Sequence, residues 1–190
     1  MLNVVLFGPP GAGKGTQADK LVEHYGILHV STGDIIRNEI KNGTKLGLEV
    51  KNYTDRGELV PDQLVISIIE DFISKNLDAK GCIFDGFPRT TLQAEAFDKM
   101  LKDNNQEVTL MLSLEVPDEE LVKRLLQRGL VSGRTDDANP EVIQNRINVY
   151  KAQTAVVADH YAAQNKLHVI NGVGTIDEIF NRLCTEINKY

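Results

Sequence analysis

The chain has 190 residues, of which 42% are hydrophobic and 25% are charged, a composition typical of one folded globular domain. No apolar run approaches the roughly 20 residues that a membrane span needs, which argues against a membrane protein. The formal net charge of −6 argues against a nucleic-acid-binding protein, because a phosphate backbone requires a basic surface.

The N-terminal segment, MLNVVLFGPPG, carries no basic region and no cleavage site of small residues, so we expect no export signal. Its short apolar run predicts a buried strand instead. The two cysteines, Cys82 and Cys184, lie far apart in apolar patterns, without a metal-ligand neighbour at a useful spacing. We expect both to be buried free thiols, which fits a protein of the reducing cytoplasm.

Short apolar runs alternate with longer amphipathic stretches along the chain. The runs are rich in Val, Ile and Leu, as in strands that are buried on both faces of a parallel sheet. We predict strands at residues 3–7, 28–30, 81–85, 109–114 and 167–170. We predict helices at residues 14–25, 33–42, 45–56, 61–76, 92–104, 117–129, 140–165 and 176–189. This order predicts an α/β fold with a doubly wound, five-stranded parallel sheet.

Two segments interrupt the alternation. Three helical patterns follow one another between residues 30 and 81 without a strand, which predicts an inserted helical unit. The polar segment RGLVSGRTDDANP, residues 128–140, predicts a mobile loop between two helices. Ligands of open α/β sheets bind beyond the carboxyl ends of the strands, so both segments could close over such a site.

A glycine-rich segment, GPPGAGKGT, follows the first predicted strand and precedes a predicted helix. It fits the pattern G-x-x-x-x-G-K through Gly8, Gly13 and Lys14. Glycines let the backbone N–H groups turn inward, and the helix directs its positive end at bound phosphates. The usual Ser or Thr after the lysine is Gly15, and Thr16 stands one place later. We call residues 8–16 the phosphate cradle; the alternative is a glycine-rich turn without a ligand.

The third predicted strand ends in Asp85, at the edge of the sheet where ligands bind. In P-loop enzymes an aspartate at this place orients the water shell of Mg²⁺. The alternative is an aspartate that caps a helix or a turn. Gly86, Pro88 and Arg89 follow and predict a tight turn that presents a guanidinium group.

Six of the eight arginines lie in glycine-containing turns or recur at helical spacing near the two interrupting segments: Arg37, Arg89, Arg124, Arg128, Arg134 and Arg146. A planar guanidinium group suits phosphate oxygens, although any single arginine could be a solvated surface charge. Transfer between two nucleotides brings five phosphate groups together, and their repulsion must be neutralised. An acceptor phosphate is already ionised near neutral pH, which agrees with the lack of a convincing general base among the four histidines.

The segments GPPGAGKGTQ, HVSTGDIIR, GELVPD, FDGFPRTTLQAEAF and RGLVSGRTDD occur here in the order and spacing of adenylate kinases. The chain resembles this family over almost its whole length. The resemblance implies a P-loop NTPase-like kinase domain over residues 1–190 that moves a phosphoryl group reversibly from ATP to AMP, giving two ADP, with Mg²⁺ bound to ATP. It also implies an NMP-binding insertion at residues 31–60 and a short lid at residues 127–137. The lid has no cysteines, so we expect no zinc.

The resemblance further implies roles for individual residues. The ATP-binding residues would be Gly11, Ala12, Gly13, Lys14, Gly15, Thr16, Arg124, Arg128 and Gly174. The AMP-binding residues would be Thr32, Arg37, Glu58, Leu59, Val60, Gly86, Phe87, Pro88, Arg89, Gln93, Arg134 and Arg146. The catalytic residues would be Lys14, Arg89, Arg128, Arg134 and Arg146, and Asp85 would hold Mg²⁺ through water. Asp136 and Asp137 would pair with the arginines and help to close the lid.

Two other functions compete with this interpretation. A UMP/CMP kinase looks similar overall, but those relatives tend to carry a smaller residue in place of Thr32 and an asparagine-type residue in place of Gln93. A glutamine can pair bidentately with an adenine edge. A nucleotide-binding switch would need no second nucleotide pocket with its own arginines. We therefore expect ATP, AMP and ADP as partners of a cytoplasmic monomer, without nucleic acid or membrane.

Overall fold

The computed structural model describes residues 1–190, apart from the side chain of Thr135. The strands are β1 (Leu2–Phe7), β2 (Leu28–Ser31), β3 (Gly81–Asp85), β4 (Leu110–Glu115) and β5 (Leu167–Asn171). They form one five-stranded sheet in the order β2-β3-β1-β4-β5, and every pairing is parallel. The predicted α/β fold with a five-stranded parallel sheet is therefore confirmed.

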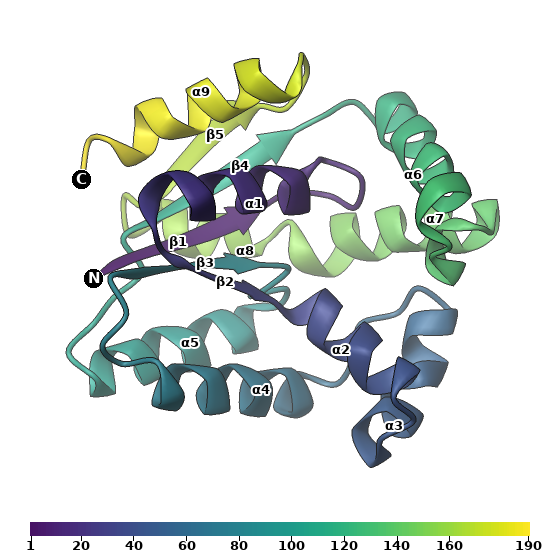
Figure 1. Cartoon of the computed structure of the whole chain (residues 1–190), viewed down its shortest axis with the longest axis horizontal. Helices are drawn as coiled ribbons and strands as arrows, with labels where there is room; N and C mark the ends of the chain where they lie inside the picture. The colour runs from purple at the N-terminus through teal and green to yellow at the C-terminus, as the bar shows by residue number, and fades with distance from the viewer.

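The helices cover both faces of this sheet (Figure 1). They are α1 (Lys14–Tyr25), α2 (Thr32–Lys41), α3 (Lys45–Asp55), α4 (Asp62–Lys75), α5 (Thr91–Asp103), α6 (Asp118–Ser132), α7 (Pro140–Val149), α8 (Val157–Ala162) and α9 (Ile176–Ile187). Two short helical segments, the 3₁₀-helix η1 (Thr135–Asp137) and the π-helix η2 (Tyr150–Thr154), lie on either side of α7. Among the described residues, no helix combines the length and the apolar character that crossing a membrane requires.

Side chains of the central strand β1 alternate between two buried clusters. Val4 and Leu6 lie in one cluster, which includes residues of α1 and α9. Val5 and Phe7 lie in the other, which includes residues of α4, α5 and α8. This burial on both faces explains why the strands read as continuous apolar runs.

Two helical units project beyond the carboxyl ends of the strands, α2 with α3 and α6 with α7 (Figure 1). The chain leaves β1 toward β2 and β3 on one side and later returns to β4 on the other side. The carboxyl end of β1 is thus a topological switch point, where α/β proteins open a crevice for ligands. The fold places the glycine-rich segment at this point.

Two helix predictions were wrong in detail. The helix expected at residues 117–129 continues to Ser132, and its C-cap is Gly133 with φ 63°. The single helix expected at residues 140–165 is α7, η2 and α8 instead. In η2 the N–H of Ala155 donates to the carbonyl of Tyr150 at 2.8 Å, an i→i+5 bond that inserts one residue into the helical turn.

Candidate active site

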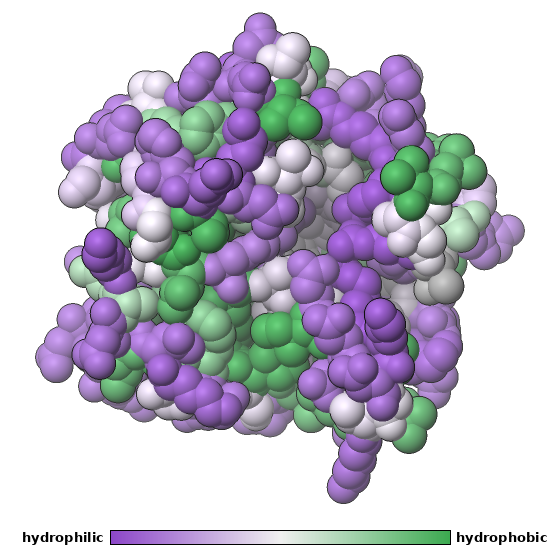
Figure 2. All heavy atoms as spheres, viewed as in Figure 1, coloured by the Kyte–Doolittle hydropathy of each residue, from purple (hydrophilic) through white to green (hydrophobic). Residues whose placement is uncertain are grey.

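A cavity of about 1780 Å³ lies beyond the carboxyl ends of the central strands. All the ATP-binding, AMP-binding, catalytic and metal-binding residues that the sequence predicted line this cavity. They come from the phosphate cradle, the end of β3 and the turn after it, both projecting units, the segment between α3 and α4, helix α5 and the loop after β5. Figure 2 shows a hollow on this face of the molecule, bordered by hydrophilic residues. The fold thus gathers the predicted residues, and their individual roles stay predictions.

The phosphate cradle has the geometry that binds anions. Gly8, Gly11 and Gly13 have φ angles of 140°, 86° and 95°, a region that side-chain-bearing residues rarely adopt. Helix α1 begins directly after Gly13, and no side chain caps its first N–H groups. These groups and the helix dipole point at the cavity, where a phosphate would satisfy them.

Lys14 bends back over the cradle. Its Nζ donates to the carbonyl oxygens of Gly8 and Pro9 at 2.7 and 3.1 Å. Burial lowers the pKa of Lys14 to about 8; the charge of Asp85 opposes this shift, and the charges of Arg89 and other arginines add to it. An ammonium group with excess positive charge around it is a binding site for an anion.

Arg89 stands in the same positive region. Its Nε donates to the carbonyl of Gly86 at 2.7 Å, which fixes the guanidinium group in the turn after β3. Burial lowers the pKa of Arg89 to about 10, and the charge of Arg146 adds to this effect. Together with Lys14, Arg89 forms a partly desolvated cationic wall that phosphate oxygens would neutralise.

Arg128 of α6 and Arg146 of α7 share one buried carboxylate. Asp137 accepts hydrogen bonds from Nε and a terminal nitrogen of Arg128, at 2.6 and 3.0 Å, and from Arg146 at 2.6 Å. Its side chain has no exposed surface. Burial alone would raise the pKa of Asp137, but the hydrogen bonds and charges of the two arginines outweigh it and hold the pKa below its usual value. Asp136 makes a further ion pair with Arg146 at 2.9 Å.

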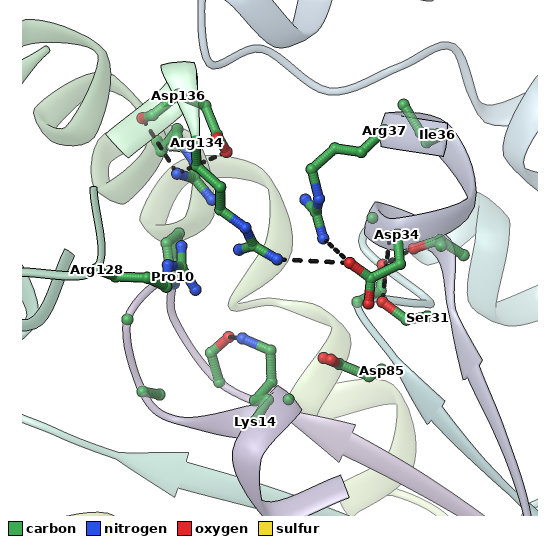
Figure 3. Close-up of a pocket in the computed structure, with 18 of the residues that line it drawn as sticks. Pro10, Lys14, Ser31, Asp34, Ile36, Arg37, Asp85, Arg128, Arg134 and Asp136 are labelled. Carbon is green, nitrogen blue, oxygen red and sulfur yellow. Dashed lines mark hydrogen bonds and ion pairs between the residues drawn. The ribbon is translucent and has the colours of Figure 1, made fainter. Parts of the chain in front are cut away.

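A carboxylate that the sequence analysis did not single out connects the two projecting units. Asp34 of α2 lies 2.5 Å from Arg37 and 3.5 Å from Arg134, which lies between α6 and η1. Figure 3 shows Arg134 extending across the cavity toward Asp34, with Lys14 and Asp85 below. Arg37 and Arg134 therefore converge on one space, although they are distant in sequence. The sequence alone does not reveal this contact, because Asp34 looks like an ordinary acidic residue in the first turn of a helix.

Gln93 of α5 has an amide whose orientation its neighbours dictate. Its Oε1 accepts from the backbone N–H of Arg89 at 2.8 Å, and its Nε2 donates to Oδ1 of Asp62 at 2.7 Å. The side chain is buried in the cavity wall. Nearby, Thr32 Oγ1 donates to the carbonyl of Gly86 at 2.9 Å. The sequence analysis missed Asp62, which ends the GELVPD segment.

The other end of the cavity is bounded by the loop after β5. Arg124 forms an ion pair with Glu120 at 2.8 Å and donates to the carbonyl of Gly172 at 3.2 Å. Gly174, with φ 131°, follows in the same loop. Arg124 and Gly174 both line the cavity. Strand β5, which precedes this loop, lies on the other side of β1 from β3, which precedes the turn that leads to Gln93.

Asp85 ends β3 beside the cradle, and its side chain is largely buried. Its Oδ2 would lie 3.8 Å from a Cβ placed on Gly15, so the carboxylate faces the start of α1. Among the described residues, no three His, Cys, Asp or Glu side chains form a protein-only metal cluster. One carboxylate next to a phosphate cradle fits Mg²⁺, which keeps several waters and shares its ligands with substrate phosphates.

Comparisons with known proteins agree with this geometry. The family model described as adenylate kinase matches residues 6–166. The adenylate kinase of Bacteroides thetaiotaomicron is 53% identical over 189 residues, and that of Flavobacterium psychrophilum is 52% identical over 189 residues. In both cases the match covers 100% of this chain and 100% of the relative. The chain therefore belongs to the adenylate kinase family, and the phosphotransferase function that its motifs predicted is confirmed.

Proposed function

We propose that this chain transfers the γ-phosphoryl group of ATP to AMP reversibly, giving two molecules of ADP and balancing the adenine nucleotides. The observation that carries the proposal is one continuous cavity that is lined by a phosphate cradle, a buried glutamine amide and several arginines. A nucleotide-binding switch needs only the first of these parts. The name of the relatives, adenylate kinase, supports adenylate as the acceptor.

The reaction needs positioning and charge rather than proton removal. An oxygen of the AMP phosphate attacks the γ-phosphorus, and the bond to the β–γ bridging oxygen breaks, so that oxygen leaves with ADP. The attacking oxygen already carries negative charge near neutral pH. The chain therefore contributes by holding the two oxygens in line and by stabilising the charge on the phosphoryl group between them.

The cations divide this work according to their positions. Lys14, at the cradle, binds the β- and γ-phosphates of ATP. Arg37 and Arg89 line the acceptor side and bind the AMP phosphate. Arg128, Arg134 and Arg146 approach from the lid side and surround the transferring group; their planar groups can each contact two oxygens. Asp137 keeps Arg128 and Arg146 in place before the nucleotides arrive.

The acceptor base is read by Gln93. With one bond to Arg89 N–H and one to Asp62, the amide keeps one acceptor position on Oε1 and one donor position on Nε2. These match the N6 amino group and the N1 atom of adenine. Glu58, Leu59 and Val60 complete the pocket, with Thr32 and the turn at residues 86–88 beside it. Arg124 and Gly174 would hold the adenine of ATP at the opposite end.

Two segments close over the reactants. We assign residues 31–60 to the unit that closes on AMP and residues 127–137 to the lid that closes on ATP. The contact between Arg134 and Asp34 supports this assignment, since it joins the two segments across the cavity. Closure of both before transfer excludes water and prevents loss of the γ-phosphoryl group by hydrolysis.

Asp85 would hold a Mg²⁺ ion through water, and Thr16, the last residue of the cradle, is exposed. When bound, Mg²⁺ neutralises charge on the β- and γ-phosphate oxygens. The short lid contains no cysteine, and zinc has no role in the proposal. We further infer a cytoplasmic monomer; the two free, buried cysteines fit a reducing compartment.

The acceptor can be tested by measuring ADP formation from ATP with AMP, UMP, CMP or no acceptor. We expect rapid ADP formation with AMP only. Faster turnover with UMP or CMP would replace the proposal with a pyrimidine nucleotide kinase. ADP formation that does not depend on any acceptor would favour a slow hydrolase or switch.

The role of Gln93 is tested by Gln93→Ala, which removes both hydrogen bonds to the base. We expect the KM for AMP to rise by about tenfold or more, the scale of losing hydrogen bonds in a site built to make them, while the KM for ATP changes little. Equal changes in the two KM values would remove Gln93 from the acceptor pocket.

A further inference from the structure

We propose that Asp62 is a positioning residue that makes the acceptor site selective for 6-amino purines over 6-oxo purines, by preventing the amide of Gln93 from flipping. The inference rests on the proposed function, in which Gln93 reads the acceptor base. Asp62 itself lies outside the set of residues that line the cavity. It therefore acts through Gln93 and not through its own contact with the nucleotide.

The orientation of the Gln93 amide follows from what its two neighbours can do. The backbone N–H of Arg89 can only donate, so it selects the oxygen Oε1, at 2.8 Å. The carboxylate of Asp62 can only accept, so it selects the nitrogen Nε2, at 2.7 Å. A flipped amide would place its NH₂ group against the N–H of Arg89 and its oxygen against the carboxylate of Asp62. The buried amide of Gln93 would then lose both hydrogen bonds and meet a like group on each side.

The orientation decides which base fits. In the observed orientation, Oε1 of Gln93 can accept from the N6 amino group of adenine and Nε2 can donate to N1. A 6-oxo purine such as that of IMP presents the reverse order, with an acceptor at O6 and a donor at N1. It could pair with Gln93 only after the amide flips, and Asp62 opposes that flip.

The helices are arranged so that Asp62 cannot easily move away from Gln93. Asp62 is the first residue of α4, and its Oδ1 also accepts a hydrogen bond from Thr90 Oγ1 at 3.0 Å. Thr90 in turn is the N-cap of α5 and accepts from the backbone N–H of Gln93 at 3.2 Å. The carboxylate is thus fixed from two sides. This second bond also offers a purely structural alternative, in which Asp62 only joins α4 to α5.

The test is Asp62→Asn, which keeps the size of the side chain but can either accept from Nε2 or donate to Oε1. We expect the ratio of kcat/KM for AMP to kcat/KM for IMP to fall by about tenfold, the difference between a hydrogen bond to a charged acceptor and one to a neutral acceptor. The KM for AMP should rise, while kcat and the KM for ATP stay within about twofold. Because both acceptors are measured on one sample, the ratio does not depend on how much of the variant is folded.

Two further variants separate positioning from structure. Thr90→Val removes the second bond of Asp62 and the cap of α5, and should lower stability. The bond from Gln93 Nε2 to the charged carboxylate remains, so the AMP:IMP ratio should change by less than about threefold. In a Gln93→Ala background, Asp62→Asn should have no further effect on the ratio, because the residue through which it acts is gone.

An unchanged ratio in Asp62→Asn overturns the inference, as does a fall of the same size in Thr90→Val, or a full effect of Asp62→Asn without Gln93. None of these results touches the proposed function as long as the wild-type protein turns over AMP. If the wild-type protein forms no ADP from AMP, the proposed function fails instead, and the two failures are therefore distinguishable.

Discussion

Replacing Asp137 by Asn should loosen the lid, because this buried carboxylate is the counter-charge of both Arg128 and Arg146. Removing one partner of a buried ion pair typically costs about 3–5 kcal/mol. The side chain of Arg128 is 37% exposed, so water recovers part of that loss. We therefore expect Asp137→Asn to lower the free energy of opening the lid by roughly 2–3 kcal/mol, after discounting for solvent screening.

Native-state hydrogen exchange in the last turn of α6, residues 129–132, measures this cost. A loss of about 2–3 kcal/mol corresponds to exchange that is roughly 30- to 150-fold faster in Asp137→Asn than in the wild-type protein. Asp136→Asn is the matched control, since among the described side chains Asp136 forms an ion pair only with Arg146 and keeps 19% of its side chain exposed. That variant should accelerate exchange by no more than about fivefold. Equal acceleration in both variants, or less than fivefold in Asp137→Asn, would refute the reasoning.

Three further results are expected. Lys14→Ala should lower turnover by roughly 10²-fold or more, the scale of losing one preorganised electrostatic contact, and near-normal kcat would show that the phosphates lie elsewhere. Lys14 has a pKa of about 8, so the unbound side chain loses its proton as the pH rises through 8, and only the charged form attracts phosphate. ATP binding should therefore weaken above pH 8 and take up a proton, seen by calorimetry in buffers of different ionisation enthalpy; Lys14→Arg should show neither effect. Gly129→Ala should lower the melting temperature, because its Cβ would lie 2.5 Å from the backbone oxygen of Asp137; an unchanged melting temperature would mean that the lid backbone shifts freely.

Much of the site could be predicted from the sequence because its parts are local motifs. The glycines of the phosphate cradle require backbone angles that few other residues adopt, so Gly8, Gly11 and Gly13 identify the turn without knowledge of the rest of the chain. The apolar runs fixed the strands within one or two residues, since burial on both faces of a parallel sheet leaves a strong signal.

Features that the regular spacing of helices and strands does not encode were missed. Gly129 looked like the end of a helix, where glycine is common, yet it lies inside α6. Its missing side chain instead allows close approach to the backbone of Asp137, and Gly133 caps the helix. The π-helix η2 was also not predicted, because one extra residue in a turn changes the spacing of apolar residues only slightly.

The partners of the site residues were hidden for the same reason. Asp62 and Gln93 are 31 positions apart, and Asp34 and Arg134 are 100 positions apart. Neither spacing is one at which two side chains meet on a single helix or strand. The sequence therefore indicated which side chains line the cavity, but not which carboxylates hold those side chains in place.

The most direct test of the account follows the γ-phosphoryl group by phosphorus NMR in a mixture of the wild-type protein, ATP, AMP and Mg²⁺. We predict that two ADP appear for each ATP consumed, that inorganic phosphate does not accumulate, and that ATP alone stays intact. Release of inorganic phosphate at the same rate with and without AMP would contradict the account, because it would mean that water and not AMP receives the phosphoryl group.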